Sequence, residues 1–498
     1  MKKTDLTPIS ELVRRKSIVM KANVNRVITR PYIPHGEARV QDIINRVLGL
    51  DEDQVVSLFD TTMHNFSHRH RNFRNILEGN FERVSAYVPS VDKLSKERRL
   101  LIGAYFTAEY SVEAAALFNP SIVKVASQEA DSEGSCRFVM SFRATGEGHI
   151  SSIEFRGGII DANGDFFFDA LSNYIATPET RSNPRYNRLL FQMKLQEMGA
   201  NDKVVRWLLD ELPKQFPQDD LLEKLEGLRD VGNLRRQDKK AATEMVMWLV
   251  QSNYEILFPK DHPISERVIF PVSTTESQGI EDARFVRFVD DDGTVTYYAT
   301  YTAFNGDRIL PQLIKTTDFL AFKVMTMYGA QAHGKGMALF PRKIGGKFAM
   351  LSRQDGAHCS IMFSDTLHYW EQASILQEPE FPYEFFQMGN SGSPIETSEG
   401  WLVVTHGVGP MRTYSLGIEL LDLEDPTRIV SRIEHPILQP NPQEREGYVP
   451  NVVYSCGAII HQNELIIPYA YADHSCTIAT LSLSEVMTRL MQRTRPTS

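Results

Sequence analysis

The sequence predicts an all-β core, a five-bladed β-propeller, that carries an N-terminal helical region and a helical insertion. Three observations lead to this prediction. Short runs rich in Val, Tyr, Phe and Thr recur beyond residue 111. The residues that end four of these runs are about 50 to 65 positions apart, a period typical of propeller blades. Two other segments, before residue 110 and at about 178–256, have helical spacing of their apolar residues.

The N-terminal region, residues 1–110, is predicted to be helical. Its segment from Val40 to Phe59 places apolar residues at helix-like spacings, and Pro31 and Pro34 separate this segment from the preceding chain. The basic run Ser67–Arg74 is interpreted as a solvated helix face or, alternatively, as a contact with an anion or a partner subunit.

The propeller domain is predicted to span 111–490. Its strand-like runs are Phe138–Phe142, Val295–Thr302, Phe348–Leu351, Trp401–Thr405 and Leu465–Tyr471. These runs end near Arg143, Thr302, Arg353, His406 and Ala472. The longer interval between the first two ends has room for about one blade and the helical insertion, in which Val204, Leu208 and Leu212 share a helix face.

Composition excludes several classes of protein. The 498 residues are 42% hydrophobic and 23% charged, which is ordinary for a globular chain and rules out a disordered chain or a coiled-coil rod. The net charge of −9 argues against general nucleic-acid binding, although a small basic pocket for an anion remains compatible with it. With no secretory signal and no apolar stretch of membrane-spanning length, we expect a cytoplasmic protein without a membrane partner. The four cysteines match no zinc or redox spacing and are expected to be reduced thiols.

Polar residues near the ends of the inner strands of a propeller converge on its axis, so they are the candidate site. The candidates are Asn119, Arg143, Asp282, Arg284, Lys335, Arg353, His406, Asn451 and Asp473. The chain has no nucleotide-binding glycine loop, no HExxH or other dense metal-ligand spacing, and no GxSxG elbow around Ser393. We therefore expect neither a metal site nor a serine hydrolase.

Eight short motifs occur in the order found in one known family. They are Phe118–Ser121, Gly279–Arg284, Lys335 with Ala338–Pro341, Ser364–Trp370, Gly400–Val408, Leu421–Pro426, Val449–Val453 and Tyr469–Asp473. Together they resemble the motifs of glycoside hydrolase family 130, the mannoside phosphorylases and some β-mannosidases. The resemblance covers about residues 114–485. Three features depart from it: Ala283 replaces the usual Pro, the N-terminal helical region is longer than in compact members, and the helical insertion is unusual.

The resemblance implies a five-bladed propeller with a sugar pocket on its axis and inverting attack on a β-mannosidic bond. In the phosphorylases, inorganic phosphate attacks and α-mannose 1-phosphate forms. Asp282 matches the general acid, whose proton is thought to travel through a hydroxyl of the bound mannosyl unit. Lys335, Arg353 and His406 match the phosphate site, to which Arg143 can be added. Inorganic phosphate would be a co-substrate, and no cofactor is expected.

Chemistry is consistent with these roles. A carboxylic acid can protonate the leaving oxygen, and phosphate needs no second carboxylate because it is already an anion. Arg and Lys are suited to hold phosphate oxygens. Asn119, Asn451 and Asp473 are suited to orient mannose hydroxyls, and Arg284 is a further candidate substrate contact shared with phosphate.

Less specific interpretations stay open for single residues. Asp282 could pair with Arg284, and Arg353 with Asp355. His406 could be a buried imidazole bonded to a carbonyl group, and Lys335 an ordinary loop lysine.

Two other functions also stay open. An inverting β-mannosidase would need a second carboxylate, for which Glu419 and Glu396 are the nearest spare candidates. A non-catalytic sugar-binding propeller would need neither an acid nor cations. Because helical extensions of this family often build oligomers, the resemblance also implies a homo-oligomer.

Overall fold

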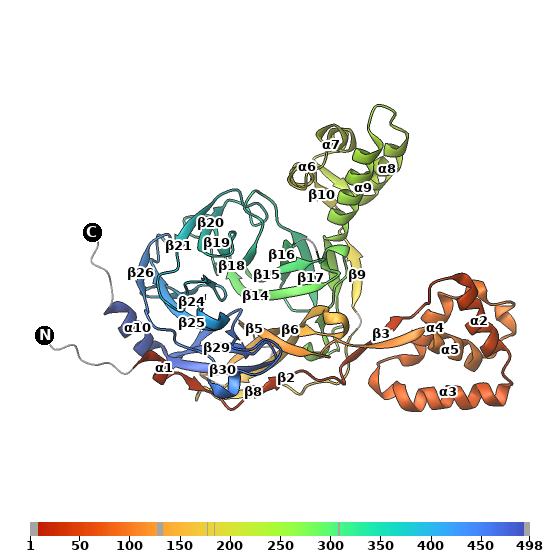
Figure 1. The fold of residues 1–498 in the computed structure, drawn as a ribbon, viewed down its shortest axis with the longest axis horizontal. Coiled ribbons are helices and arrows are strands. Elements are labelled where there is room, and N and C mark those ends of the chain that lie inside the picture. Colours follow the sequence, from red (N-terminus) through yellow and green to blue (C-terminus); the bar gives the residue numbers. More distant parts are fainter. Residues whose placement is uncertain (1–7, 127–132, 177, 184, 307–308, 493–498) are drawn as a thin grey trace.

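The computed structural model describes residues 8–126, 133–176, 178–183, 185–306 and 309–492. Its core consists of five antiparallel groups of strands, called groups 1 to 5 in chain order (Figure 1). Group 1 contains β5 (Ala116–Val125), β6 (Cys136–Thr145), β7 (Ser151–Ile160), β8 (Phe166–Phe168) and β13 (Val268–Ile269). Group 2 contains β14 (Gly279–Val289), β15 (Val295–Phe304), β16 (Ile309–Thr316) and β17 (Ala321–Thr326), extended by β12 (Tyr254–Leu257) and β9 (Glu179–Ser182).

The remaining three groups follow without interruption. Group 3 contains β18 (Lys335–Leu339), β19 (Phe348–Arg353), β20 (Cys359–Ser364) and β21 (Ala373–Gln377). Group 4 contains β22 (Gln387–Asn390), β23 (Ile395–Thr397), β24 (Gly400–Val408), β25 (Tyr414–Leu421) and β26 (Ile429–Arg432). Group 5 contains β27 (Val453–Tyr454), β28 (Ile459–His461), β29 (Glu464–Tyr471) and β30 (Ser475–Ser482). The five strand-like runs of the sequence lie within β6, β15, β19, β24 and β29.

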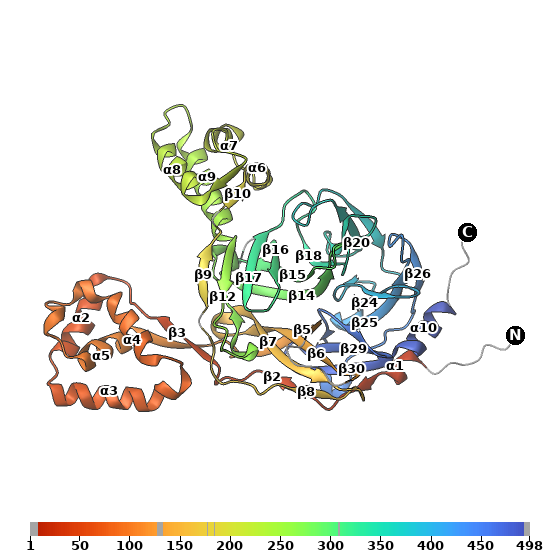
Figure 2. The same ribbon diagram turned by 180° about the vertical axis from the view of Figure 1, so that it is seen from behind.

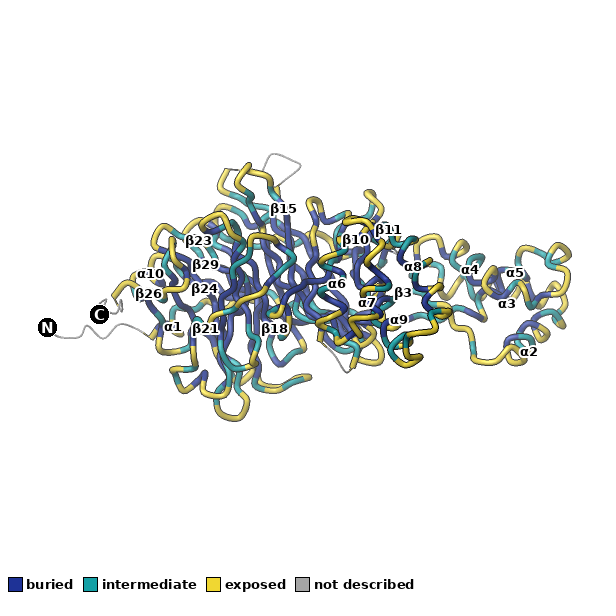
Figure 3. Tube along the Cα trace, turned by 90° about the horizontal axis from the view of Figure 1, so that it is seen from above, coloured by how far each residue is buried: buried dark blue, intermediate teal, exposed yellow. Residues whose placement is uncertain are grey.

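The groups close into a ring because each packs an apolar face on the next. Five clusters of buried side chains lie between groups 1 and 2, 2 and 3, 3 and 4, 4 and 5, and 5 and 1. Members from the two groups of each contact include Phe155 and Phe285, Phe288 and Met350, Phe340 and Trp401, Leu420 and Tyr469, and Phe142 and Ile478. Figure 3 shows the buried strands of the core and the exposed outer turns. The strand ends of all five groups are thereby held around one centre.

The N-terminal region is mainly helical, as predicted, only from Glu37 to Tyr105. Helices α2 (Glu37–Leu48), α3 (Glu52–Phe66), α4 (Phe73–Glu82) and α5 (Lys96–Tyr105) form a lobe beside the ring, as Figures 1 and 2 show. The chain before this lobe is extended instead: after α1 (Ile9–Leu12), β1 (Arg14–Arg15) and β2 (Met20–Lys21) pair with β30, and β3 (Val27–Pro31) pairs with β4 (Thr107–Ser111). The edge of β30 supplies the strand partner for residues 14–21, and β4 supplies the partner for β3.

Within the lobe, the segment Val40–Phe59 forms two helices rather than one. The break lies at Gly49–Asp51, where Asp51 caps α3 in a capping box with Gln54.

The basic run Ser67–Arg74 contacts the chain itself. Arg71 donates two hydrogen bonds to Glu266, at 2.7 and 2.9 Å, and Arg69 and His70 contact Glu109. Three residues of this run therefore attach the helical lobe to the rest of the chain. His68, Asn72 and Arg74 are exposed, in agreement with a solvated face.

The insertion projects from group 2 as a second helical lobe (Figure 2). It consists of α6 (Arg188–Glu197), α7 (Asp202–Leu209), α8 (Gln218–Gly227) and α9 (Arg236–Gln251), with the short pair β10 (Arg185–Asn187) and β11 (Gln215–Pro217). The lobe has its own apolar core, which includes Phe191, Leu208 and Val246. The last helix of the described residues, α10 (Leu483–Met491), packs on the outside of groups 4 and 5.

The four cysteines, all among the described residues, form no disulfide bond. In the part of the chain that the structure describes, no helix is both long enough and apolar enough to cross a membrane. The domain limits at 110 and 490 stay predictions.

Candidate functional site

The innermost strands of groups 1, 2 and 3 are each interrupted at the same end by a β-bulge. The register shifts between Phe118 and Ser121 in β5, between Glu281 and Arg284 in β14, and between Lys335 and Ala338 in β18. Asn119 and Asp282, inside two of these bulges, have left-handed backbone angles with φ of 48° and 53°. Bulges of this kind redirect side chains, and Asn and Asp tolerate the left-handed region better than most residues. The bulges thus turn polar side chains toward the centre of the ring.

These side chains line a cavity of about 180 Å³. Its lining residues are Phe118, Asn119, Arg143, Asp282, Lys335, Arg353, Gln387, His406, Arg412, Tyr414, Val452, Tyr454 and Asp473. All five groups contribute, so residues that are far apart in the sequence meet here. Seven of the nine candidates from the sequence are among them.

The other two candidates lie outside the cavity lining. Arg284 is buried behind it and donates a hydrogen bond of 2.8 Å to the Tyr454 hydroxyl, which places Tyr454 rather than Arg284 at the surface of the cavity. Asn451 has φ of 64°, and its carbonyl oxygen accepts from the backbone of Tyr414, so it shapes the turn whose next residue, Val452, lines the cavity.

Asp282 is held by groups from two strands. Its Oδ1 accepts a hydrogen bond of 2.6 Å from Asn119 Nδ2 and a longer one of 3.4 Å from Arg143 Nη1. Burial alone would raise the pKa of this carboxyl, but the charges of Arg143 and Arg284 and the Asn119 hydrogen bond outweigh it and lower the pKa below its usual value. The carboxylate pairs with Arg143 rather than with Arg284, whose Nη1 faces the Asp282 carbonyl oxygen.

Glu281, the residue before Asp282, bridges two of the cations. Its Oε1 accepts from Arg143 Nη2 at 3.0 Å, and its Oε2 accepts from Lys335 Nζ at 2.7 Å. Lys335 is therefore fixed at the start of β18 by a carboxylate from group 2 and is not an unconstrained loop lysine.

Arg353 and His406 form a second pair. Arg353 Nη1 lies 3.0 Å from His406 Nε2, and the amide of Gln387, with its oxygen facing Arg353, accepts from the same nitrogen. Burial and the charges of Arg353 and Arg284 lower the pKa of His406 well below its usual value. His406 is thus a neutral imidazole, and its Nε2 can accept from Arg353. The strand beside it needs a glycine, because a Cβ at Gly389 would stand 2.9 Å from His406 Cε1.

Asp473 differs from Asp282 although both line the cavity. Burial and the nearby Asp282 charge raise the pKa of Asp473 to about 6, against the opposing charges of Arg143 and Arg412. The Asp282 carboxyl is therefore ionised at neutral pH, whereas the Asp473 carboxyl is close to its titration point.

The sequence reasoning missed four polar residues of the cavity: Gln387, Arg412, Tyr414 and Tyr454. Gln387 and Tyr454 lie on the innermost strands of groups 4 and 5, β22 and β27, and Arg412 lies in the turn before β25. The short length of β22 and β27 left no strand pattern to find them. One signal in the sequence could have identified Arg412 as a cavity residue. It lies six residues after His406, across a Gly-Pro turn.

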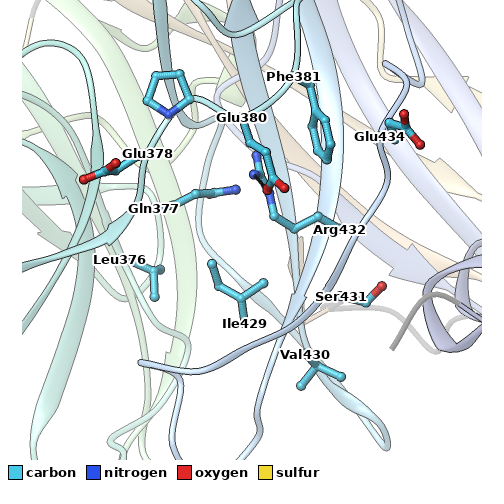
Figure 4. A pocket seen from close by; sticks show the side chains of 11 residues that line it. Leu376, Gln377, Glu378, Glu380, Phe381, Ile429, Val430, Ser431, Arg432 and Glu434 are labelled. Carbon is cyan, nitrogen blue, oxygen red and sulfur yellow. Dashed lines mark hydrogen bonds and ion pairs between the residues drawn. The ribbon is translucent and has the colours of Figure 1, made fainter. Parts of the chain in front are cut away.

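A larger groove of about 790 Å³ lies on the outside of the ring between β21 and β26 (Figure 4). Its charged lining is Glu378, Glu380, Glu434 and Arg432, and Arg432 is bonded to Glu380 and Glu384. Three lining carboxylates against one cation repel an anion. The smaller central cavity, where four cations face two carboxylates, is the candidate site.

The two spare carboxylates considered for a hydrolase lie away from the central cavity. Glu396 pairs with Arg342 at 2.8 Å. Glu419 is buried near Arg432, at 3.7 Å, behind the outer groove.

Replacing Glu419 by Gln is expected to remove a pH dependence of stability. Burial raises the pKa of Glu419 to about 7 against the charge of Arg432, whereas its ordinary value is 4.5. The folded protein therefore binds this proton more tightly than the unfolded chain, so the free energy of unfolding falls as pH rises from 4.5 to about 7 and stays lower above. Relative to that of the wild type, the free energy of unfolding of Glu419→Gln should increase by on the order of 3 kcal/mol when the pH is raised from 5 to 8. Thermal unfolding at both pH values, with exposed Glu378→Gln as control, measures this. An equal shift at the two pH values would contradict it.

The ring of sheets and its cation-rich centre define the class of the protein: a sheet-built protein whose axial cavity suits an anion beside a hydroxyl-bearing ligand. Among the described residues, no three His, Cys, Asp or Glu side chains are arranged to hold a metal ion.

The model of a protein family described as beta-1,4-mannooligosaccharide phosphorylase matches residues 236–492. The chain belongs to this family, glycoside hydrolase family 130. The match includes Asp282, Lys335, Arg353, His406 and Asp473, and it begins after Asn119 and Arg143.

Several characterised relatives share the family. A 1,2-beta-oligomannan phosphorylase of Thermoanaerobacter sp. (strain X514) is 35% identical over 225 residues, which are 43% of this chain and 74% of that protein. A beta-1,2-mannobiose phosphorylase of Listeria innocua is 30% identical over 229 residues, 45% of this chain and 63% of that protein. The solved structure of a Listeria innocua beta-1,2-mannobiose phosphorylase bound to beta-1,2-mannobiose has 24% identity, covers 77% of this chain and 94% of that one, and has a TM-score of 0.45.

Proposed function

We propose that the protein is an inverting glycoside phosphorylase that cleaves β-mannosidic bonds in mannosyl oligosaccharides with inorganic phosphate and releases α-mannose 1-phosphate. Its five groups of strands are, in this proposal, the blades of a five-bladed propeller, which the five inter-group apolar clusters support. The family and the names of its relatives support the reaction class.

One observation carries the proposal: the central cavity contains more positive than negative charge. Arg143, Lys335, Arg353 and Arg412 line it together with Asp282 and Asp473. Glu281, outside the lining, adds a third carboxylate that contacts Arg143 and Lys335, so one positive charge is in excess. A net positive charge in this partly exposed cavity attracts an anion, and two guanidinium forks with a lysine match the oxygens of phosphate. In this proposal Lys335, Arg353 and Arg143 hold phosphate, while neutral His406 keeps Arg353 in place.

Asp282 is the proposed general acid. Its carboxyl is ionised because the charges of Arg143 and Arg284 and the hydrogen bond from Asn119 stabilise the anion. A bound phosphate would add negative charge and engage Arg143, and both effects raise the pKa of Asp282 toward that of a proton donor. The proton would then pass to the leaving oxygen, directly or through a mannosyl hydroxyl, while phosphate attacks the opposite face of the anomeric carbon.

Asn119 and Asp473 are the proposed contacts to mannose hydroxyls, since both line the cavity beside Asp282. Arg284 and Asn451 would act indirectly, through Tyr454 and the turn before β27.

A β-mannosidase on the same scaffold is the second candidate. Asp473 is the carboxyl that favours it, because it lies in the cavity and its pKa of about 6 would suit a base for water. The surplus of cations favours the phosphorylase, since water needs none of them.

The experiment that tests the proposal is a screen of mannosyl disaccharides of different linkage, each incubated with and without phosphate. A phosphorylase releases the acceptor sugar only when phosphate is present. Equal release of mannose in both incubations would favour the mannosidase, and sugar binding without turnover would favour a non-catalytic propeller. Phosphate as the sole co-substrate, the absence of a cofactor, the homo-oligomer and the cytoplasmic location stay predictions.

A further inference from the structure

Glu281 is a carboxylate that the proposed reaction does not use, although it lies at the centre of the cation set. It accepts a hydrogen bond from Arg143 in group 1 and one from Lys335 in group 3, while its own strand belongs to group 2. Its side chain is 14% exposed and that of Arg143 is 20% exposed, so solvent screens this contact less than the contact with Lys335, which is 40% exposed. A single carboxylate thus joins two of the residues assigned to phosphate.

This arrangement has two opposite consequences for an anion in the cavity. The carboxylate fixes two flexible side chains, which lowers the entropy lost when they grip a ligand. The same negative charge neutralises part of the cationic surface and repels a phosphate nearby. Lys335 retains donors for an anion because an ammonium has three and Glu281 takes one.

We propose that Glu281 is a positioning residue that holds Arg143 and Lys335 in the geometry needed for attack by phosphate, at the expense of phosphate affinity. Glu281 is not among the residues that line the central cavity, and in this proposal it acts only through the two cations. This inference rests on the proposed function, which makes phosphate the attacking group.

The contacts of Arg143 agree with separate roles for the adjacent carboxylates of Glu281 and Asp282. Arg143 donates to Glu281 through Nη2 and to Asp282 through Nη1, so one guanidinium spans both. The β-bulge between Glu281 and Arg284 allows both side chains to reach it, whereas in a regular strand successive side chains point to opposite faces.

The test separates the two consequences by changing charge and length independently. Glu281→Gln keeps the shape but removes the charge, and Glu281→Asp keeps the charge but shortens the reach. Binding of inorganic sulfate, measured by calorimetry, reports anion affinity without turnover, and phosphorolysis kinetics report positioning.

For Glu281→Gln we expect sulfate to bind about fivefold tighter or more, while kcat falls about tenfold and KM for the sugar changes little. For Glu281→Asp we expect sulfate affinity within about twofold of wild type and a similar fall in kcat. The exposed change Glu378→Gln, which removes the same charge from the outer groove, should alter neither quantity.

Equal or weaker sulfate binding in Glu281→Gln, with thermal unfolding unchanged, would overturn the inference, as would full kcat in both variants. Failure of the proposed function is distinguishable, because the wild type would then show no phosphate-dependent product while the sulfate measurements still give their answer.

Discussion

Asp282→Asn should lower kcat for phosphorolysis by about 10³-fold, because an amide cannot give a proton to the leaving oxygen. Asn keeps the size of the side chain and can still accept from Asn119 through its oxygen, so the cavity should hold its shape. KM for phosphate should change much less than kcat. The measurement is the initial rate of mannose 1-phosphate formation from the disaccharide that the wild type uses best.

A substrate with a leaving group that needs no proton separates acid catalysis from misfolding. With dinitrophenyl β-mannoside the loss in Asp282→Asn should shrink to within about tenfold. The matched control is Asp290→Asn, just beyond the far end of β14, where the carboxylate pairs with Lys343 and is remote from the cavity. Equal losses with both substrates would contradict the role of general acid.

Lys335→Ala should raise KM for phosphate about 10²-fold, which corresponds to about 2.7 kcal/mol, and should raise KM for the sugar only a few-fold. In the proposed function the ammonium is a phosphate ligand, placed at the bulge of β18, and Glu281 fixes its position. Because the reverse reaction uses the same site, KM for mannose 1-phosphate should rise by a similar factor. Steady-state kinetics in both directions measure the two values.

Lys343→Ala is the control for the lysine change. Its ammonium pairs with Asp290 and Asp291 outside the cavity, so both KM values should stay within about twofold of wild type. An unchanged phosphate KM in Lys335→Ala, or an equal rise in the sugar KM, would assign Lys335 to the sugar or to the fold.

The sequence predicted the strands best where apolar and β-branched residues recur along them. Runs such as Val295–Thr302 and Trp401–Thr405 are apolar and β-branched because they are buried on both faces, and they identified the strands correctly. Asn119, Asp282 and His406 were found because ordered motifs surround them. Each of these motifs lies on or beside a strand that lines the cavity.

Other features depend on distant parts of the chain and left no local signal. Residues 14–21 are extended only because β30, more than 450 residues away, offers an open edge. The neutral state of His406 follows from its burial beside Arg353 and Arg284, which sequence spacing does not express. The bulges that turn Asn119 and Asp282 inward depend on the pairing register, and Tyr454 lies in the cavity on a strand of two residues.

The central claim is that phosphate, held by cations from several strand groups, attacks the anomeric carbon. The most direct test of this claim is a time course of the reaction followed by phosphorus and proton NMR. With a β-mannobiose that is a substrate and inorganic phosphate, the spectra should show α-mannose 1-phosphate and the acceptor sugar forming in equal amounts, and no reaction without phosphate. Free mannose as the product in both samples, or a β-configured phosphate, would contradict the claim.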